Sequence, residues 1–142
     1  MNAYTYEEIE IGHTETFEVT VTEESLDAFR GITGDVNPLH RDDEFAKARG
    51  MKGHVAFGLL TASYLSALAG VYLPGKRSLV QSLEIKFASP VYPGDTLTVS
   101  GEVTEKNDAY RVLRLKVAVR NGKGEKVLRG TMQIGFTEEG HG

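Results

Sequence analysis

The chain has 142 residues with a formal net charge of −4, a hydrophobic fraction of 40% and a charged fraction of 25%. These values are typical of a single globular domain that buries about two thirds of its unfolded surface. They argue against a generic nucleic-acid surface, and the absence of cysteine excludes disulfides, thiolate metal ligands and a cysteine nucleophile.

The beginning of the chain, MNAYTYEEIEIG, lacks both the basic stretch and the apolar core of a secretory signal. The longest apolar stretch, residues 55–73, is broken by glycine, serine and threonine. It is too short and too polar for a membrane span and suits a buried helix instead. We therefore expect a cytoplasmic protein whose partners include neither a membrane nor a nucleic acid.

The first elements are predicted to be a strand and a helix. Residues 15–21 have the composition of a short strand. Thr22 follows, and it can cap a helix whose acidic first turn is favoured by the helix dipole. Apolar residues continue at helical spacing as far as Thr33, and Gly34 is a suitable helix end.

The segment after this helix, residues 35–40, cannot be helix interior. Pro38 has no amide hydrogen, and it also restricts the residue before it to an extended conformation. Asp42 is then expected to cap a short helix that ends at Gly50. After a loop, the apolar stretch predicts a helix over residues 58–69.

The second half of the chain alternates apolar and polar residues, which is typical of strands with one buried face. In the first run the alternation places Leu79, Gln81, Leu83, Ile85 and Phe87 on one side. Turns are expected where glycine, proline and asparagine gather, at residues 93–95 and 121–124. The four predicted strands are residues 79–87, 97–103, 113–119 and 128–136.

Together these elements predict a single α+β domain over residues 1–142. The helix at residues 58–69 is the one element apolar enough on all sides to fill the concave face of a curved antiparallel sheet. A curved sheet wrapped around a central helix is the hot-dog fold. The final residues, 138–142, are expected to fray.

Asp35 and His40 are the residues most suited to catalysis. They lie on one loop, and the Asn-Pro turn between them can direct both side chains toward one point. A carboxylate and an imidazole so placed can move protons around a water molecule. The alternative is an ordinary turn with a surface histidine, and the short motif alone does not exclude it.

A longer match favours catalysis. Residues 32–40, ITGDVNPLH, resemble the hydratase signature of MaoC-like dehydratases and (R)-specific enoyl-CoA hydratases. The resemblance extends in family order over about residues 10–136, which is nearly the whole chain. The further matching blocks are FGLLTAS at 57–63, LPGK at 73–76, QSLEIKF at 81–87 and PVYPGDT at 90–96.

The resemblance implies a role for particular residues. Asp35 and His40 match the catalytic pair that holds and activates the attacking water. Gly58 matches the glycine whose amide binds the thioester oxygen, and the amides of a helix N-terminus suit a developing negative charge. Ser66 matches a serine that hydrogen-bonds near the pair, although a small polar residue there also allows close packing. Asn37 is expected to shape the loop rather than to react.

The sequence departs from the family at Phe57, where many relatives have a histidine before the glycine. The absent histidine is not one of the catalytic pair, so the departure is expected to alter the acyl pocket or the rigidity of the loop, and thus the substrate more than the reaction. His54 is close enough for a compensating role, or it is an ordinary loop histidine. His13 and His141 have no neighbours at ligand-like spacing, and we expect neither a metal nor a cofactor.

The implied reaction is hydration of a trans-2-enoyl-CoA to an (R)-3-hydroxyacyl-CoA, in fatty acid or polyhydroxyalkanoate-type metabolism. It is reversible, so the enzyme is equally a 3-hydroxyacyl-thioester dehydratase, and the carrier is either coenzyme A or acyl carrier protein. The family also implies a homodimer or higher homo-oligomer. Lys76 and Arg77 either meet the coenzyme phosphates or are solvated. The remaining alternatives are a hot-dog acyl-CoA thioesterase and a non-catalytic acyl-CoA-binding module.

Overall fold

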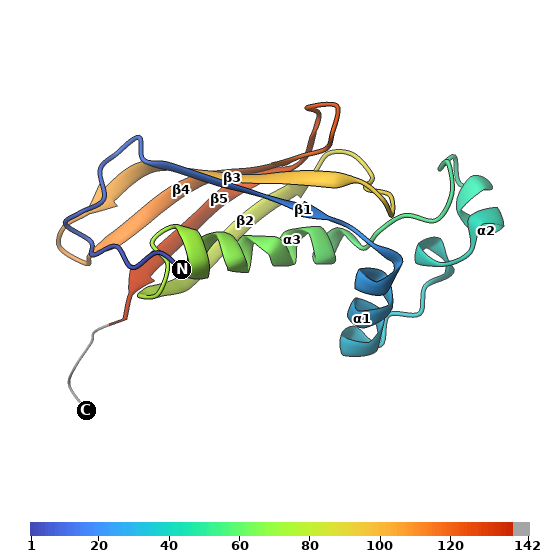
Figure 1. The fold of residues 1–142 in the computed structure, drawn as a ribbon, viewed down its shortest axis with the longest axis horizontal. Coiled ribbons are helices and arrows are strands. Elements are labelled where there is room, and N and C mark those ends of the chain that lie inside the picture. The colour runs from blue at the N-terminus through green and yellow to red at the C-terminus, as the bar shows by residue number, and fades with distance from the viewer. Residues whose placement is uncertain (138–142) are drawn as a thin grey trace.

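The computed structural model describes residues 1–137. Five strands form one antiparallel sheet of order β1-β3-β4-β5-β2, and a single long helix lies along its concave face (Figure 1). Two further helices stand beyond one end of the sheet. In chain order the elements are β1 (Thr14–Thr20), α1 (Glu23–Thr33), α2 (Asp43–Lys47), α3 (Gly58–Ala67), β2 (Ser78–Phe87), β3 (Thr96–Asn107), β4 (Val112–Arg120) and β5 (Lys126–Phe136).

α1 and α2 begin at the predicted caps. The Thr22 hydroxyl accepts a hydrogen bond of 3.1 Å from the amide of Ser25, and the Asp42 carboxylate accepts one of 3.1 Å from the amide of Phe45. Gly34 ends α1 in the left-handed conformation, with φ of 74°. α2 ends at Lys47, so it is shorter than the sequence predicted.

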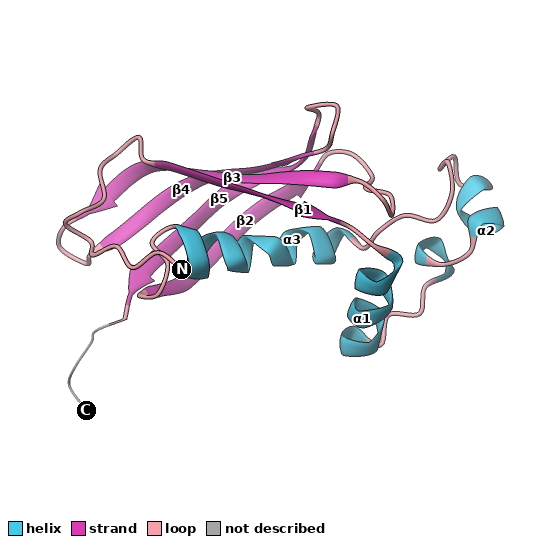
Figure 2. Ribbon diagram, viewed as in Figure 1, coloured by secondary structure: helices cyan, strands magenta, loops and turns pink. Residues whose placement is uncertain are grey.

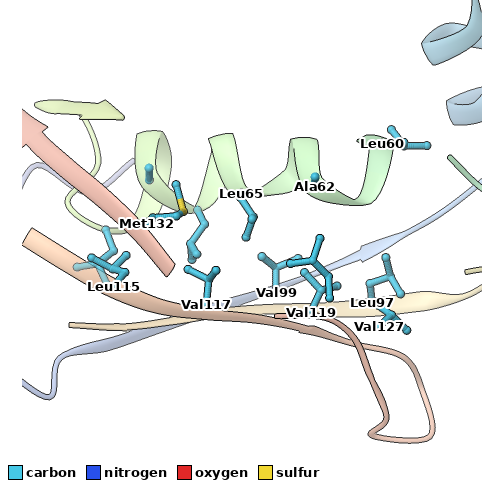
Figure 3. Close-up of a cluster of buried hydrophobic side chains, with 14 of the residues drawn as sticks. Leu60, Ala62, Leu65, Leu97, Val99, Leu115, Val117, Val119, Val127 and Met132 are labelled. Carbon is cyan, nitrogen blue, oxygen red and sulfur yellow. The ribbon is translucent and has the colours of Figure 1, made fainter. Parts of the chain in front are cut away.

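The core lies between α3 and the concave face of the sheet (Figure 3). Leu65 on the helix is 1% exposed, and the strand residues that face it are equally buried. Each such side chain contributes about 1.5–3 kcal/mol when it leaves water. The labelled core residues are Leu60, Ala62, Leu65, Leu97, Val99, Leu115, Val117, Val119, Val127 and Met132.

The arrangement of one curved sheet around one helix is the predicted hot-dog fold (Figure 2). α3 continues without a break into a π-helical turn, Leu68–Tyr72, so the central helical segment reaches slightly beyond the predicted end. Among the described residues, no helix is both long enough and apolar enough to cross a membrane. The predicted fraying of residues 138–142 lies outside the described residues.

The predicted faces of β2 are wrong in its first half. Val80 pairs with Ile134 and Leu83 pairs with Met132, and a register shift lies between Val80 and Ser82. Because Ile134 and Met132 are core residues, Val80 rather than Leu79 shares the concave face with Leu83. The bulge inserts one residue and thereby reverses the alternation. Strict alternation along the sequence could not reveal it.

We expect Gly130→Ala to weaken the pairing of β5 with β2. A Cβ atom at Gly130 would come within 2.8 Å of the Ile85 Cα and also meet the Glu84 carbonyl. Backbone atoms cannot move aside cheaply, so the free energy of unfolding should fall by at least about 1–3 kcal/mol, measured by urea denaturation. Gly122→Ala is the matched control, because nothing lies within 4 Å of its Cβ position. Equal stability of the two variants would contradict the close approach.

Candidate active site

The loop after α1 is held by its own side chains. The Asp35 carboxylate accepts a hydrogen bond of 3.1 Å from the amide of Asn37, and the Asn37 carboxamide oxygen accepts one of 2.9 Å from the amide of Leu39. Asn37 thereby caps a 3₁₀ turn, Pro38–His40. Asp35 is exposed to solvent, and its second carboxylate oxygen has no hydrogen bond in the described part of the chain. The loop is therefore rigid, with one carboxylate oxygen available.

His40 has a fixed ring orientation. Its Nδ1 lies 2.9 Å from the carbonyl oxygen of Val55, and because a carbonyl only accepts, Nδ1 must carry a hydrogen. In the neutral imidazole, Nε2 then has a free lone pair and can accept a proton. Arg30 also donates a hydrogen bond of 3.2 Å to the main-chain oxygen of His40. The loop and its histidine are thus held from two sides.

Phe57, the residue that departs from the family pattern, packs against His40. The two ring centroids are 4.1 Å apart at an interplanar angle of 30°. Phe57 is 2% exposed, and it also contacts Phe29 at 4.9 Å between centroids. The Arg30 guanidinium lies 5.8 Å from the Phe57 ring. The Phe57 ring therefore packs on one face of the His40 ring, so the presence of phenylalanine at this position affects the rigidity of the loop.

His40 and Gly58 line the same cavity, which has a volume of about 350 Å³ and mostly apolar walls. Gly58 is the first residue of α3, and no side chain caps the helix at Phe57. The amides of Gly58 and Leu59, for which no partner is found among the described residues, therefore keep their capacity to bind an acceptor. A Cβ atom at Gly58 would lie 3.1 Å from the ring of Phe87, so glycine leaves room in the wall beside that ring. The imidazole of His40 and the N-terminus of α3 therefore border the same cavity.

Three predicted site residues are not brought to this cavity. Asp35, Asn37 and Ser66 are not among the residues that line it, and all three are exposed. Ser66 lies two turns beyond Gly58 on the open side of α3, and within residues 1–137 no hydrogen bond links it to Asp35 or His40. One chain thus assembles the histidine and the helix N-terminus, while the carboxylate and the serine face outward.

Thr61 is a residue that the sequence analysis did not single out. It lines the cavity one turn along α3 from Gly58, and it is 2% exposed. Its hydroxyl has no partner among the described residues. The carbonyl of Phe57, the usual acceptor for a helical threonine, already accepts from the amides of Leu60 and Thr61 itself. Only the burial pattern reveals this residue, because a lone threonine in an apolar helix carries no distinctive sequence signal.

His54 and Arg77, which were also considered as functional residues from the sequence, contact other residues of the chain. His54 contacts Glu23 and Asp43, and these two contacts raise the pKa of the His54 imidazole, the one to Asp43 most strongly. Arg77 donates a hydrogen bond to the carbonyl of Ala3, and it lies beyond the end of α3 opposite Gly58. Among residues 1–137 no group of three histidine or acidic side chains could hold a metal ion. His141 lies outside the described residues.

Comparison with known proteins places these features in a family. A family model described as a MaoC like domain matches residues 8–126. An (R)-specific enoyl-CoA hydratase of Rhodospirillum rubrum is 33% identical over 99 residues, which cover 70% of this chain and 69% of that protein. A 3-hydroxybutyryl-CoA dehydratase of Methylorubrum extorquens is 35% identical over 125 residues, covering 88% and 79%.

A solved structure agrees with the fold. The R-hydratase PhaJ1 from Pseudomonas aeruginosa superposes with a TM-score of 0.87 at 32% identity, covering 94% of this chain and 86% of that one. The sheet around α3 thus makes the protein a hot-dog domain. Because the family model spans most of the sequence, the chain belongs to the MaoC-like domain family.

We expect Thr61→Val to stabilise the protein. The substitution removes a buried hydroxyl that has no partner and replaces it with a methyl group of similar size. The free energy of unfolding should rise by about 1 kcal/mol or slightly more, measured by urea denaturation. Thr61→Ser is the control, because it keeps the hydroxyl and loses a methyl group. A Thr61→Val variant less stable than the wild type would mean that the hydroxyl has a partner.

Proposed function

We propose that this protein catalyses the reversible hydration of trans-2-enoyl-CoA thioesters to (R)-3-hydroxyacyl-CoA thioesters. The observation that carries the proposal is the cavity that His40 and the N-terminus of α3 share, next to the loop that bears Asp35. The names of the relatives support the same reaction in both directions, since one is a hydratase and another a dehydratase. They also support the (R) configuration, which one relative's name includes.

In the proposed reaction a water molecule adds across the C2–C3 double bond. The oxygen of the water bonds to C3 and keeps one hydrogen, while Asp35 orients the water and accepts the other proton. His40, whose Nδ1–H is held by the Val55 carbonyl, takes this proton from Asp35 on Nε2 and delivers it to C2, so that both side chains return to their starting protonation states. The Gly58 amide stabilises the negative charge on the thioester oxygen. The electron pair of the double bond ends in the new C2–H bond.

Asp35→Asn and His40→Gln should each lower kcat for crotonyl-CoA hydration by about 10²–10⁴-fold, because each removes an acid/base group. The melting temperature should change little for Asp35→Asn, since Asp35 is exposed. The measurement is the loss of the enoyl-thioester absorbance. Glu24→Gln, another exposed carboxylate, is the control and should retain full activity.

Near-wild-type hydration by Asp35→Asn would contradict the assignment of this residue. Release of free coenzyme A from acyl-CoA by the wild-type protein would instead favour the thioesterase alternative. Binding of acyl-CoA without any turnover would favour the non-catalytic module. Turnover, release of free coenzyme A and binding without turnover therefore separate the three functions.

We also propose that the protein is a homodimer with the thioester site at the interface. β2 is an edge strand of the sheet, and unpaired edges with apolar side chains need to be covered. Leu83 is 42% exposed and Phe87 is 53% exposed on this strand, and Leu59 of α3 is 66% exposed. Phe87 also lines the cavity with Gly58, so this exposed apolar surface is continuous with the cavity.

Leu83→Asp should convert the dimer to a monomer, because it introduces a charge into the proposed apolar interface. The measurement is light scattering at micromolar concentration. Ile11→Asp is the matched control: Ile11 is 65% exposed in a loop away from β2, and its substitution should leave the dimer intact. A monomeric wild-type protein would overturn the interface.

The carrier and the compartment are also proposals. Coenzyme A is the carrier that the names of the two reported relatives contain. We propose the cytoplasm as the compartment, with which a cysteine-free sequence is compatible.

A further inference from the structure

His54 links its own segment of the chain to the starts of α1 and α2, near the loop that bears Asp35 and His40. Its Nδ1 lies 2.6 Å from the carboxylate of Asp43 at the start of α2, and its Nε2 lies 2.6 Å from the carboxylate of Glu23 at the start of α1. Its main-chain amide donates a further hydrogen bond of 2.8 Å to Asp43. The side chain of His54 is 20% exposed. We call these three residues the His54 clamp.

The clamp requires a charged imidazole. An ionised carboxylate offers only acceptors, so each ring nitrogen of His54 must carry a hydrogen to bond its partner. Two short hydrogen bonds to carboxylates are of the charge-assisted kind, which are stronger than neutral ones. The charged groups that act on His54 are Glu23 from α1 and Asp43 from α2, and Lys47 acts on Asp43.

The clamp is one residue away from the group that orients His40. The carbonyl of Val55 accepts the hydrogen bond from His40 Nδ1 at 2.9 Å, and the amide of Val55 donates to the carbonyl of Leu39 at 3.1 Å. Any shift of the chain at His54 therefore moves the acceptor that fixes the His40 ring. Without that acceptor, either nitrogen of a neutral His40 could carry the hydrogen.

We infer that His54 is a positioning residue for His40: its imidazolium, held between Glu23 and Asp43, fixes the Val55 carbonyl and so keeps Nε2 of His40 free for proton transfer. The inference rests on the proposed function only in that His40 is the residue that moves the proton. The geometry of the clamp and its effect on the His40 ring do not depend on the substrate.

The clamp has a defined pH range. The pKa of His54 is raised, mainly by the hydrogen bond to Asp43, and the pKa of Asp43 is lowered, mainly by the hydrogen bond from His54. The stabilisation from His54 is present below its unfolded pKa, and it is lost as the pH rises through the raised folded value. The stabilisation from Asp43 is lost as the pH falls through its lowered value. The clamp is complete between these limits.

The test compares His54→Gln with the wild type. A neutral carboxamide cannot donate to both carboxylates as an imidazolium does. We expect kcat for crotonyl-CoA hydration to fall by up to about 100-fold with KM little changed. The decline of kcat at alkaline pH that comes from His54 should disappear. The ¹⁵N signals of the His40 ring should change from one fixed tautomer to an average of two.

His13→Gln is the matched control. His13 also pairs with a carboxylate at 2.6 Å, that of Glu15, but it directly precedes β1, whereas α1 follows the other end of that strand. α1 and α2 stand together beyond that other end (Figure 1). This variant should keep the kcat, the pH profile and the His40 signals of the wild type. If His54→Gln fails to fold, Glu23→Gln removes one contact alone and should show the same changes in smaller degree.

Unchanged His40 signals in His54→Gln would overturn the inference whatever the activity, and so would an unchanged kcat and pH profile. A wild-type protein that hydrates no enoyl-CoA, with His40 signals that still respond to His54→Gln, would overturn the proposed function and leave the positioning of the His40 ring intact. The two failures are therefore distinguishable.

Discussion

The packing of α3 against the concave face of the sheet is the interaction on which the other features depend. The helix fills the core with its buried side, where Leu65 meets the strands, and this burial fixes the position of its first residue, Gly58. Because no side chain caps that end, the amides of Gly58 and Leu59 stay available at the edge of the core. A helix dipole held in place by hydrophobic packing can stabilise charge without reorganising.

The second constraint is the support of His40. Its ring is stacked on Phe57 and bonded to the Val55 carbonyl, while Arg30 binds its main-chain oxygen. Phe57 lies next to Gly58 in sequence, so the residue that supports the imidazole also precedes the helix N-terminus. The proposed acid/base group and the proposed oxyanion donor are thereby held by one short segment of chain. Pre-organisation of this kind is what general acid/base catalysis needs.

The sequence predicted the elements whose causes are local. Thr22 and Asp42 could be predicted to start helices, because each side chain accepts a hydrogen bond from an amide three residues further along the chain. Gly34 could be predicted to end α1, because glycine readily adopts the left-handed conformation found there, with φ of 74°. The hot-dog fold followed from the alternation of the strands and the apolar helix. The bulge in β2 was not predicted, because the register of a strand is set by its partner, here β5.

The residues of the candidate site could be predicted only in part, because many of their contacts join segments that are distant in the sequence. The positions of His40 and Gly58 followed from the family resemblance, and the structure brings both to one cavity. The contacts of His54 with Glu23 and Asp43 join segments up to 31 residues apart, and no local pattern announces them. The buried hydroxyl of Thr61 and the role of Phe57 behind His40 also depend on packing between elements that are distant in sequence.

The proposed hydration of enoyl-CoA is tested most directly when crotonyl-CoA is incubated with the wild-type protein in ²H₂O and the product is identified by NMR and chiral analysis. Enzymatic hydration predicts (R)-3-hydroxybutyryl-CoA with one deuterium at C2 and an intact thioester. Crotonate and free coenzyme A, or crotonyl-CoA recovered unchanged, would contradict it.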